Sequence, residues 1–75
     1  MQNNGFPNNN LKKIRTEKHL ALWGLSTISG VNPTLLSAVE KHNYKPGFAV
    51  QTRIAMALGV DVSEIWPINE EKEVA

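Results

Sequence analysis

The sequence predicts an all-α fold, with five short helices in a single domain. Apolar residues recur at spacings of three and four along much of the 75-residue chain. No stretch of four to eight residues alternates strictly between apolar and polar side chains, so we expect no strand. Asparagine, glycine and proline stand where the apolar pattern is interrupted, and they mark the helix ends. A chain of this length buries a small core and leaves little room for a large cofactor cleft.

The first two helices are predicted in the N-terminal half of the chain. The first spans residues 11–18 and is capped by an asparagine at position 9 or 10. The second spans residues 20–29. It ends at Gly30, since glycine adopts left-handed backbone angles at little cost. Its inward-facing residues are expected to be Leu20, Leu25 and Ile28.

The third helix, residues 33–42, has two different faces. Pro33 fits its first position because the missing amide would have no partner there, and Asn32 supplies the cap. Leu36 and Val39 face the core. The opposite side carries Thr34, Ser37, Ala38 and Lys41. This second face is therefore free to contact a ligand.

The rest of the chain adds two helices and two terminal segments. A fourth helix spans residues 48–58, and a last helical turn over 64–66 is capped by Asp61 or Ser63. Residues 1–10 are rich in asparagine and are expected to form a flexible arm. Residues 68–75 are expected to form an acidic flexible tail, which leaves 11–67 as the domain.

Charge is distributed unevenly along the chain. Residues 1–53 contain seven basic and two acidic residues, a net charge of +5. Residues 54–75 contain one basic and five acidic residues, a net charge of −4. The basic part favours an anionic partner such as nucleic acid, although a solvated surface produces the same pattern.

Several other classes of protein are disfavoured. The chain has no cysteine, and neither a membrane-spanning apolar run nor a signal peptide is present, so we expect a cytoplasmic protein. His19 and His42 lack the spacing of metal ligands. No nucleophile arrangement or phosphate-binding glycine loop occurs. We therefore expect no enzymatic activity, no metal and no cofactor.

The most informative unit is the pair of helices joined by residues 29–32. Two helices connected by a short turn with glycine form a helix-turn-helix, whose second helix enters the major groove of DNA. Here that second helix would be residues 33–42. Helical hairpins with glycine turns also occur in proteins that do not bind DNA, so the spacing alone leaves both interpretations open.

Residues 11–67 resemble the phage repressor and Cro-like (XRE) helix-turn-helix family. The segments that carry the resemblance are LKKIR at 11–15, LSTISGV at 25–31, LSAVE at 36–40, KP at 45–46 and IAMALGV at 54–60. Pro33, Thr34 and the ending IWP at 65–67 are also similar to the Ner-like phage regulators. The resemblance implies a lambda-repressor-like domain and a transcription regulator, of the repressor type, that binds double-stranded DNA.

The resemblance also assigns roles to individual residues. Base edges would be contacted by Asn32, Pro33, Thr34, Ser37 and Ala38. DNA phosphates would be contacted by Lys12, Lys13, Lys41, Lys45 and Arg53, each of which could also be simply solvated. Arg15 and Glu40 match positions that form an ion pair between the first and third helices, the alternative being two unrelated surface charges.

A partner surface is expected in addition to the DNA-binding face. A homodimer on DNA would add the contacts that one small domain lacks. Leu22 and Trp23 stand where the family often carries glutamine, and we expect this pair to be exposed. The candidate partner surface comprises Trp23, Met56 and Trp66, with Val60, Val62 and Ile65 as further dimer candidates. Trp66 is also expected to cover the fourth helix in the core. An antitoxin-like module with a protein partner, or a pure protein-interaction domain, remains the alternative function.

Overall fold

The structure, a computed structural model, describes residues 9–67. Its helices are α1 (Leu11–Glu17), α2 (Leu22–Ser29), α3 (Pro33–His42), α4 (Phe48–Leu58) and α5 (Val62–Ile65). No strand occurs between residues 9 and 67, and the predicted all-α fold with five helices is confirmed. The expected tail at 68–75 and the first eight residues of the expected arm lie outside the described residues.

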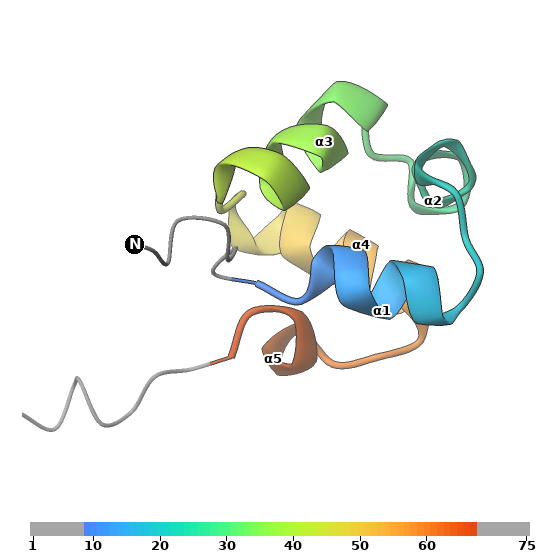
Figure 1. Ribbon diagram of the computed structural model, residues 1–75. Coiled ribbons are helices and arrows are strands. Elements are labelled where there is room, and N and C mark those ends of the chain that lie inside the picture. The colour runs from blue at the N-terminus through green and yellow to red at the C-terminus, as the bar shows by residue number, and fades with distance from the viewer. Residues whose placement is uncertain (1–8, 68–75) are drawn as a thin grey trace, which may run out of the picture.

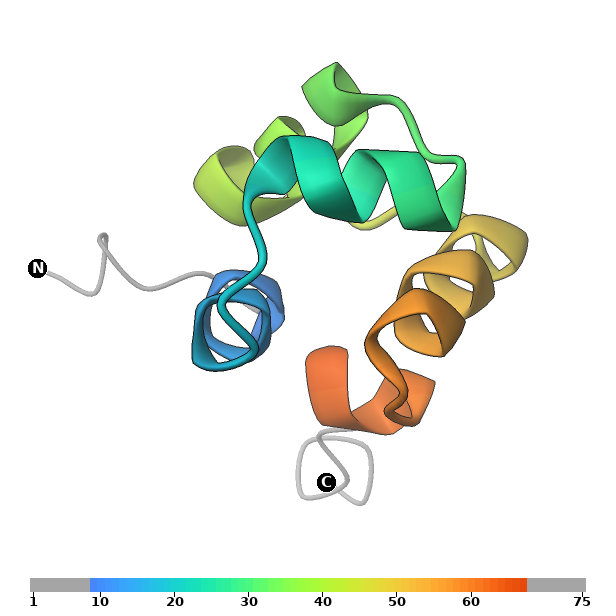
Figure 2. The same ribbon diagram turned by 90° about the vertical axis from the view of Figure 1, so that its right-hand side faces the viewer.

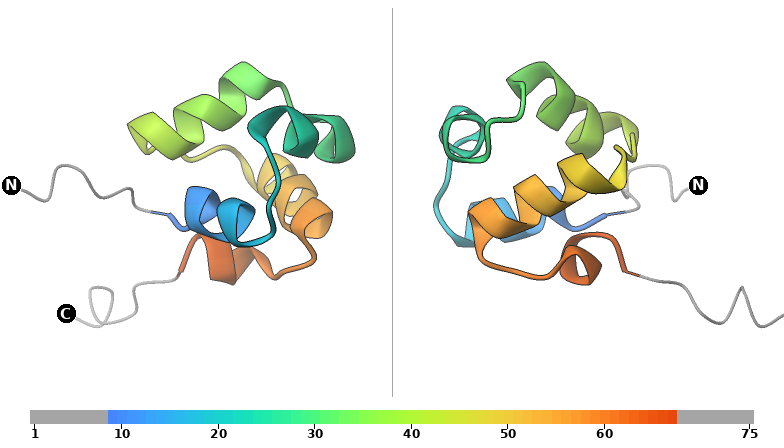
Figure 3. Two further views of the ribbon diagram at one scale, coloured as in Figure 1. Left: turned by 45° about the vertical axis from the view of Figure 1, so that its right-hand side comes forward. Right: turned by 180° about the vertical axis from the view of Figure 1, so that it is seen from behind.

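The helices are arranged so that α3 lies at the edge of the molecule. Helices α2 and α3 lie together on one side, α1 and α5 lie on the other, and α4 runs between the two groups (Figures 1 and 2). Helix α2 packs on both α3 and α4, and α1 supports α3 from below. No described helix covers the outer side of α3 (Figure 3).

Every helix contributes to one core. Leu36 and Val39 of α3 are fully buried, as predicted from the two faces of that helix. The other buried apolar residues are Leu11, Leu25, Val31, Ile54, Ala55, Leu58, Ile65 and Trp66. Trp66 is only 7% exposed. The prediction that Trp66 lies in the core is therefore correct. Ile65 is fully buried as well, so neither residue is exposed for the partner contact that the sequence also suggested.

Helix α2 differs from the prediction in its start and in its inward face. It begins at Leu22 because the chain turns at His19, which has a φ of 57°, before the helix can form. Ile28 was expected to face inward but is 56% exposed. Leu25 is buried as expected, and Ser29, one helical turn after it, takes the next inward position in place of Ile28.

Two asparagines fasten the start of α1 to the rest of the molecule. The Asn9 side chain accepts a hydrogen bond from the Leu11 amide at 2.9 Å and donates one to the Val39 carbonyl at 3.0 Å. Asn10 donates through its backbone and side chain to two carbonyls of α5, at 2.8 and 3.0 Å. Composition assigned both residues to the flexible arm, but these hydrogen bonds hold them against α3 and α5.

Helix α5 also starts earlier than expected. It spans Val62–Ile65 with Asp61 as its N-cap, whereas the sequence predicted residues 64–66. The Glu64 carboxylate accepts a hydrogen bond from the Asp61 backbone amide at 3.1 Å. This hydrogen bond satisfies a backbone amide at the helix start. It therefore fixes the start of α5 two residues before the predicted one.

An ion pair fixes the orientation of α3 relative to α1. Arg15 Nε donates to Glu40 Oε2 at 2.7 Å, and Nη2 donates to Oε1 at 3.1 Å. The remaining nitrogen, Nη1, donates to the Leu20 carbonyl between α1 and α2 at 2.7 Å. The Glu40 side chain is only 4% exposed. The hydrogen bond that Arg15 donates to the Glu40 carboxylate raises the pKa of Arg15 above its usual value, so the guanidinium stays charged.

Removal of either charge should destabilise the protein strongly. In Arg15→Met or Glu40→Leu the surviving charge is left buried without its partner, and we expect a loss of about 3 to 5 kcal/mol in the free energy of unfolding. The double variant should recover much of this loss. Urea unfolding of the two single variants, the double variant and the unchanged protein measures the interaction energy, and a value near zero would contradict the coupling.

Candidate nucleic-acid interface

The turn between α2 and α3 has the local geometry of a helix-turn-helix. Gly30 ends α2 with a φ of 74°, a left-handed conformation that strains any other residue. The Ser29 hydroxyl then accepts a hydrogen bond from the Val31 amide at 3.1 Å. The Asn32 side-chain oxygen accepts from the Thr34 amide at 2.7 Å and starts α3. The predicted cap and the predicted bounds of α3 are both correct.

The first two turns of α3 carry only short side chains on their outer side. Thr34 is exposed, and Ser37 and Ala38 are half-buried. Just before them, Asn32 is exposed and Pro33 is half-buried. The five residues predicted to contact bases therefore lie together around the first two turns of α3. None of them has a long side chain that could span a groove.

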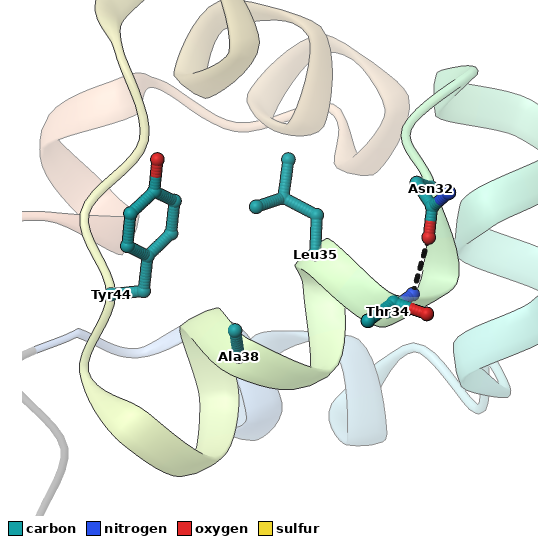
Figure 4. A pocket seen from close by; sticks show the side chains of 5 residues that line it. All are labelled: Asn32, Thr34, Leu35, Ala38 and Tyr44. Atoms are coloured by element: carbon teal, nitrogen blue, oxygen red, sulfur yellow. Dashed lines mark hydrogen bonds between the residues drawn. The ribbon is translucent and has the colours of Figure 1, made fainter.

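Two hollows flank this outer stripe. The first has a volume of about 390 Å³ and is lined by Asn32, Thr34, Leu35, Ala38 and Tyr44 (Figure 4). The second has a volume of about 440 Å³ and is lined by Trp23, Pro33, Thr34, Ser37, Ala38 and His42. Thr34 and Ala38 line both hollows, so they form the ridge between them.

Tyr44, Leu35 and His42 line the hollows but were not among the predicted site residues. Asn43 ends α3 in a left-handed conformation with a φ of 56°. The backbone amide of Tyr44 then donates to the Ala38 carbonyl at 3.3 Å, which folds the following loop back beside α3. Asparagine after the last turn is a known helix C-cap, and this signal could have indicated that Tyr44 returns toward the helix.

The five cations predicted to bind phosphates are all exposed, but they do not form one cluster. Lys41 is in the last turn of α3, and Lys45 follows Tyr44 in the loop. An Arg53 nitrogen lies 3.7 Å from the place where a Cβ of Gly30 would be, so Arg53 is beside the turn. The remaining two, Lys12 and Lys13, are on α1 and line neither hollow beside α3.

Helices α2 and α3 expose a lysine but no unpaired carboxylate. Between residues 22 and 42 the only acidic residue is Glu40, and Arg15 covers its carboxylate. No uncovered carboxylate therefore faces outward from these two helices. Since Lys41 remains exposed, the outer side of α3 suits an anionic ligand.

The expected partner surface is only partly exposed. Trp23 is 72% exposed and Met56 is 75% exposed. Leu22 is half-buried and packs against the core, so the exposed pair predicted for Leu22 and Trp23 is reduced to Trp23 alone. Val60 and Val62 also pack partly against the core. Of the predicted partner residues, Trp23 and Met56 are therefore the ones that a partner protein could reach.

Neither a metal-binding cluster nor a membrane-spanning helix is found in the described part of the chain. Over residues 9–67, no group of three or more histidine, aspartate or glutamate residues is placed to hold a metal ion. Within the same range, every helix is too short or too polar to cross a membrane.

Comparison of the fold identifies several similar solved structures. The restriction-modification controller protein C.AhdI from Aeromonas hydrophila is 25% identical, with a TM-score of 0.69 over 73% of this chain and 83% of that protein. The hypothetical transcription factor NHTF from Neisseria is 25% identical, with a TM-score of 0.71 over 87% of this chain and 75% of that one.

A third similar structure is an HTH_3 family transcriptional regulator from Vibrio cholerae. It is 27% identical, with a TM-score of 0.68 over 73% of this chain, and the match covers 31% of that regulator. No protein-family model matches the chain, and no curated protein sequence matches it. The five-helix fold of this chain is thus the fold of transcription regulators of the helix-turn-helix type.

Proposed function

We propose that this chain is a transcription regulator that binds double-stranded DNA at specific sequences, with α3 in the major groove. The observation that carries the proposal is the uncovered outer side of α3, which follows a turn of helix-turn-helix geometry. The likeness to three regulators supports the same role.

The chemistry of the site divides the work between two groups of residues. Lys41, Lys45 and Arg53 are exposed around α3 and its turn, and they would bind phosphates and position the helix. Thr34 and Ser37 offer hydroxyl groups to base edges, whereas Pro33 and Ala38 offer only apolar contact. Lys12 and Lys13 would reach the DNA backbone from α1.

We further propose that the protein binds as a homodimer and acts as a repressor. One α3 presents too few base contacts to select a site in a genome, and a second copy doubles them. Met56, which is exposed on α4, is the strongest remaining candidate for the dimer contact. Repression, which the resemblance to phage repressors implies, requires only that the bound dimer occupy a promoter.

One observation favours a second candidate function. Trp23 exposes most of its ring beside α3, and large exposed aromatic side chains are common at protein interfaces. An antitoxin-like or purely protein-interaction module would use this residue to bind a partner. A purely protein-interaction module would enrich no DNA sequence, whereas an antitoxin-like module would bind DNA and co-purify with its protein partner.

Selection of bound sites from random duplex DNA tests the proposed function. The two α3 helices of a dimer would lie about 34 Å apart, so the selected sites should contain two symmetric half-sites centred about 10 base pairs apart. The mass of the complex with the selected duplex should correspond to two chains. Failure to enrich any sequence would reject DNA binding in favour of the protein-interaction function, and unsymmetric sites bound by one chain would reject the dimer.

Substitutions at Thr34 and Lys45 should separate specificity from affinity. Thr34→Ala should reduce the preference at one base pair by about 1 to 3 kcal/mol and leave binding to random duplexes nearly unchanged. Lys45→Ala should weaken binding to all duplexes alike. It should also make the slope of log K against log salt shallower by about 0.9.

Two exposed residues, Thr16 in α1 and Lys18 directly after it, provide matched controls for this measurement. Thr16→Ala and Lys18→Ala make the same chemical changes away from both hollows beside α3. Both should leave specificity and the salt slope unchanged in binding titrations. Equal losses for Thr34→Ala on selected and random duplexes would show that α3 does not read bases.

A further inference from the structure

We infer that the hollow between α3 and Tyr44 recognises the methyl group at C5 of a pyrimidine in the major groove, on thymine or on 5-methylcytosine. The inference rests on the proposed function and adds to it the base feature that is read. In the major groove, the C5 methyl of thymine is the apolar group among the hydrogen-bonding groups of the four ordinary bases. An apolar hollow on the reading helix matches that group.

The shape of the hollow is set by three side chains. The Leu35 and Tyr44 side chains point to the same side of α3, and Ala38 lies between the points where they join the backbone (Figure 4). Leu35 is half-buried and packs against the core, which fixes this wall. The volume of about 390 Å³ is larger than one methyl group. The hollow therefore admits the methylated edge of a pyrimidine together with its methyl.

The polar groups at the hollow are poorly suited to reading other bases. The Asn32 oxygen is turned to the Thr34 amide at 2.7 Å, which holds the side chain in its capping position. A bidentate contact of Asn32 to adenine would require this oxygen to leave the cap. Positions 34, 35, 37 and 38 carry no arginine, lysine, glutamine or glutamate, so the usual partners of guanine and cytosine are missing. Apart from the short hydroxyl groups of Thr34 and Ser37, apolar contact is the means of discrimination that this part of α3 offers.

Charge favours DNA over an apolar protein segment as the occupant. Lys41 follows Ala38 by about one helical turn, and Lys45 follows Tyr44 directly. Both lysines are exposed. A pyrimidine edge in duplex DNA would bring phosphates toward these cations, whereas an apolar peptide would gain nothing from them.

The test uses the selected duplex with each thymine replaced in turn by uracil, which removes only the methyl group. At one or more positions in each half-site, affinity should fall about fourfold, the value for one buried methyl-sized group. At the same positions, a C·G pair should bind more weakly than a pair with 5-methylcytosine. The measurement needs no change in the protein, so folding does not affect it.

A pair of variants assigns the effect to the hollow. Tyr44→Ser removes the wall, and the ratio of thymine to uracil affinity should fall toward one, while Tyr44→Phe should keep the ratio. Phe48→Ser is the control, because Phe48 is an exposed aromatic residue that does not line the hollow. It should also keep the ratio.

The outcomes separate the inference from the proposed function. Absence of binding to every duplex would contradict the proposed function itself. Specific binding with equal affinity for thymine and uracil at all positions, or selected sites without thymine, would overturn only the methyl inference. A methyl preference that survives in Tyr44→Ser would overturn its assignment to this hollow.

Discussion

The buried ion pair between Arg15 and Glu40 is the contact on which the candidate interface depends. Its two hydrogen bonds, at 2.7 and 3.1 Å, join α1 to α3, and the third guanidinium nitrogen holds the loop before α2. A buried pair of this kind adds little net stability, since desolvation offsets the attraction. It fixes the angle of α3 and also covers the only carboxylate of residues 22–42. One contact thus sets both the direction and the charge of the outer face.

The outer face of α3 combines weak polar contacts with defined shape. The side chains of its first two turns are short, and the cap uses the Asn32 oxygen, so hydrogen bonds to bases would be few. The two hollows beside this face are each lined by a residue from a neighbouring segment, Tyr44 in one and Trp23 in the other. Affinity would come from the exposed lysines and specificity from the shape of the two hollows.

The sequence predicted the elements whose signals are local. Pro33 after Asn32 fixed the start of α3, and left-handed glycines fixed the ends of α2 and α4. Contacts between distant segments were harder to predict. Asn9 and Asn10 looked like arm residues because their partners lie 30 or more positions away. Ile28 fitted an apolar repeat, yet the small Ser29 occupies the inward place. Tyr44 joined the site through the fold of a loop, and the Asn43 helix cap was the local signal that could have indicated it.

The outer side of α3 is the proposed DNA-binding surface. Amide chemical shifts of the ¹⁵N-labelled protein, recorded with and without the selected duplex, test this claim most directly. The largest shifts should fall on Thr34, Ser37 and Ala38, with smaller ones at Lys41 and Lys45. Shifts centred on Met56 and α5, with α3 unchanged, would contradict the claim.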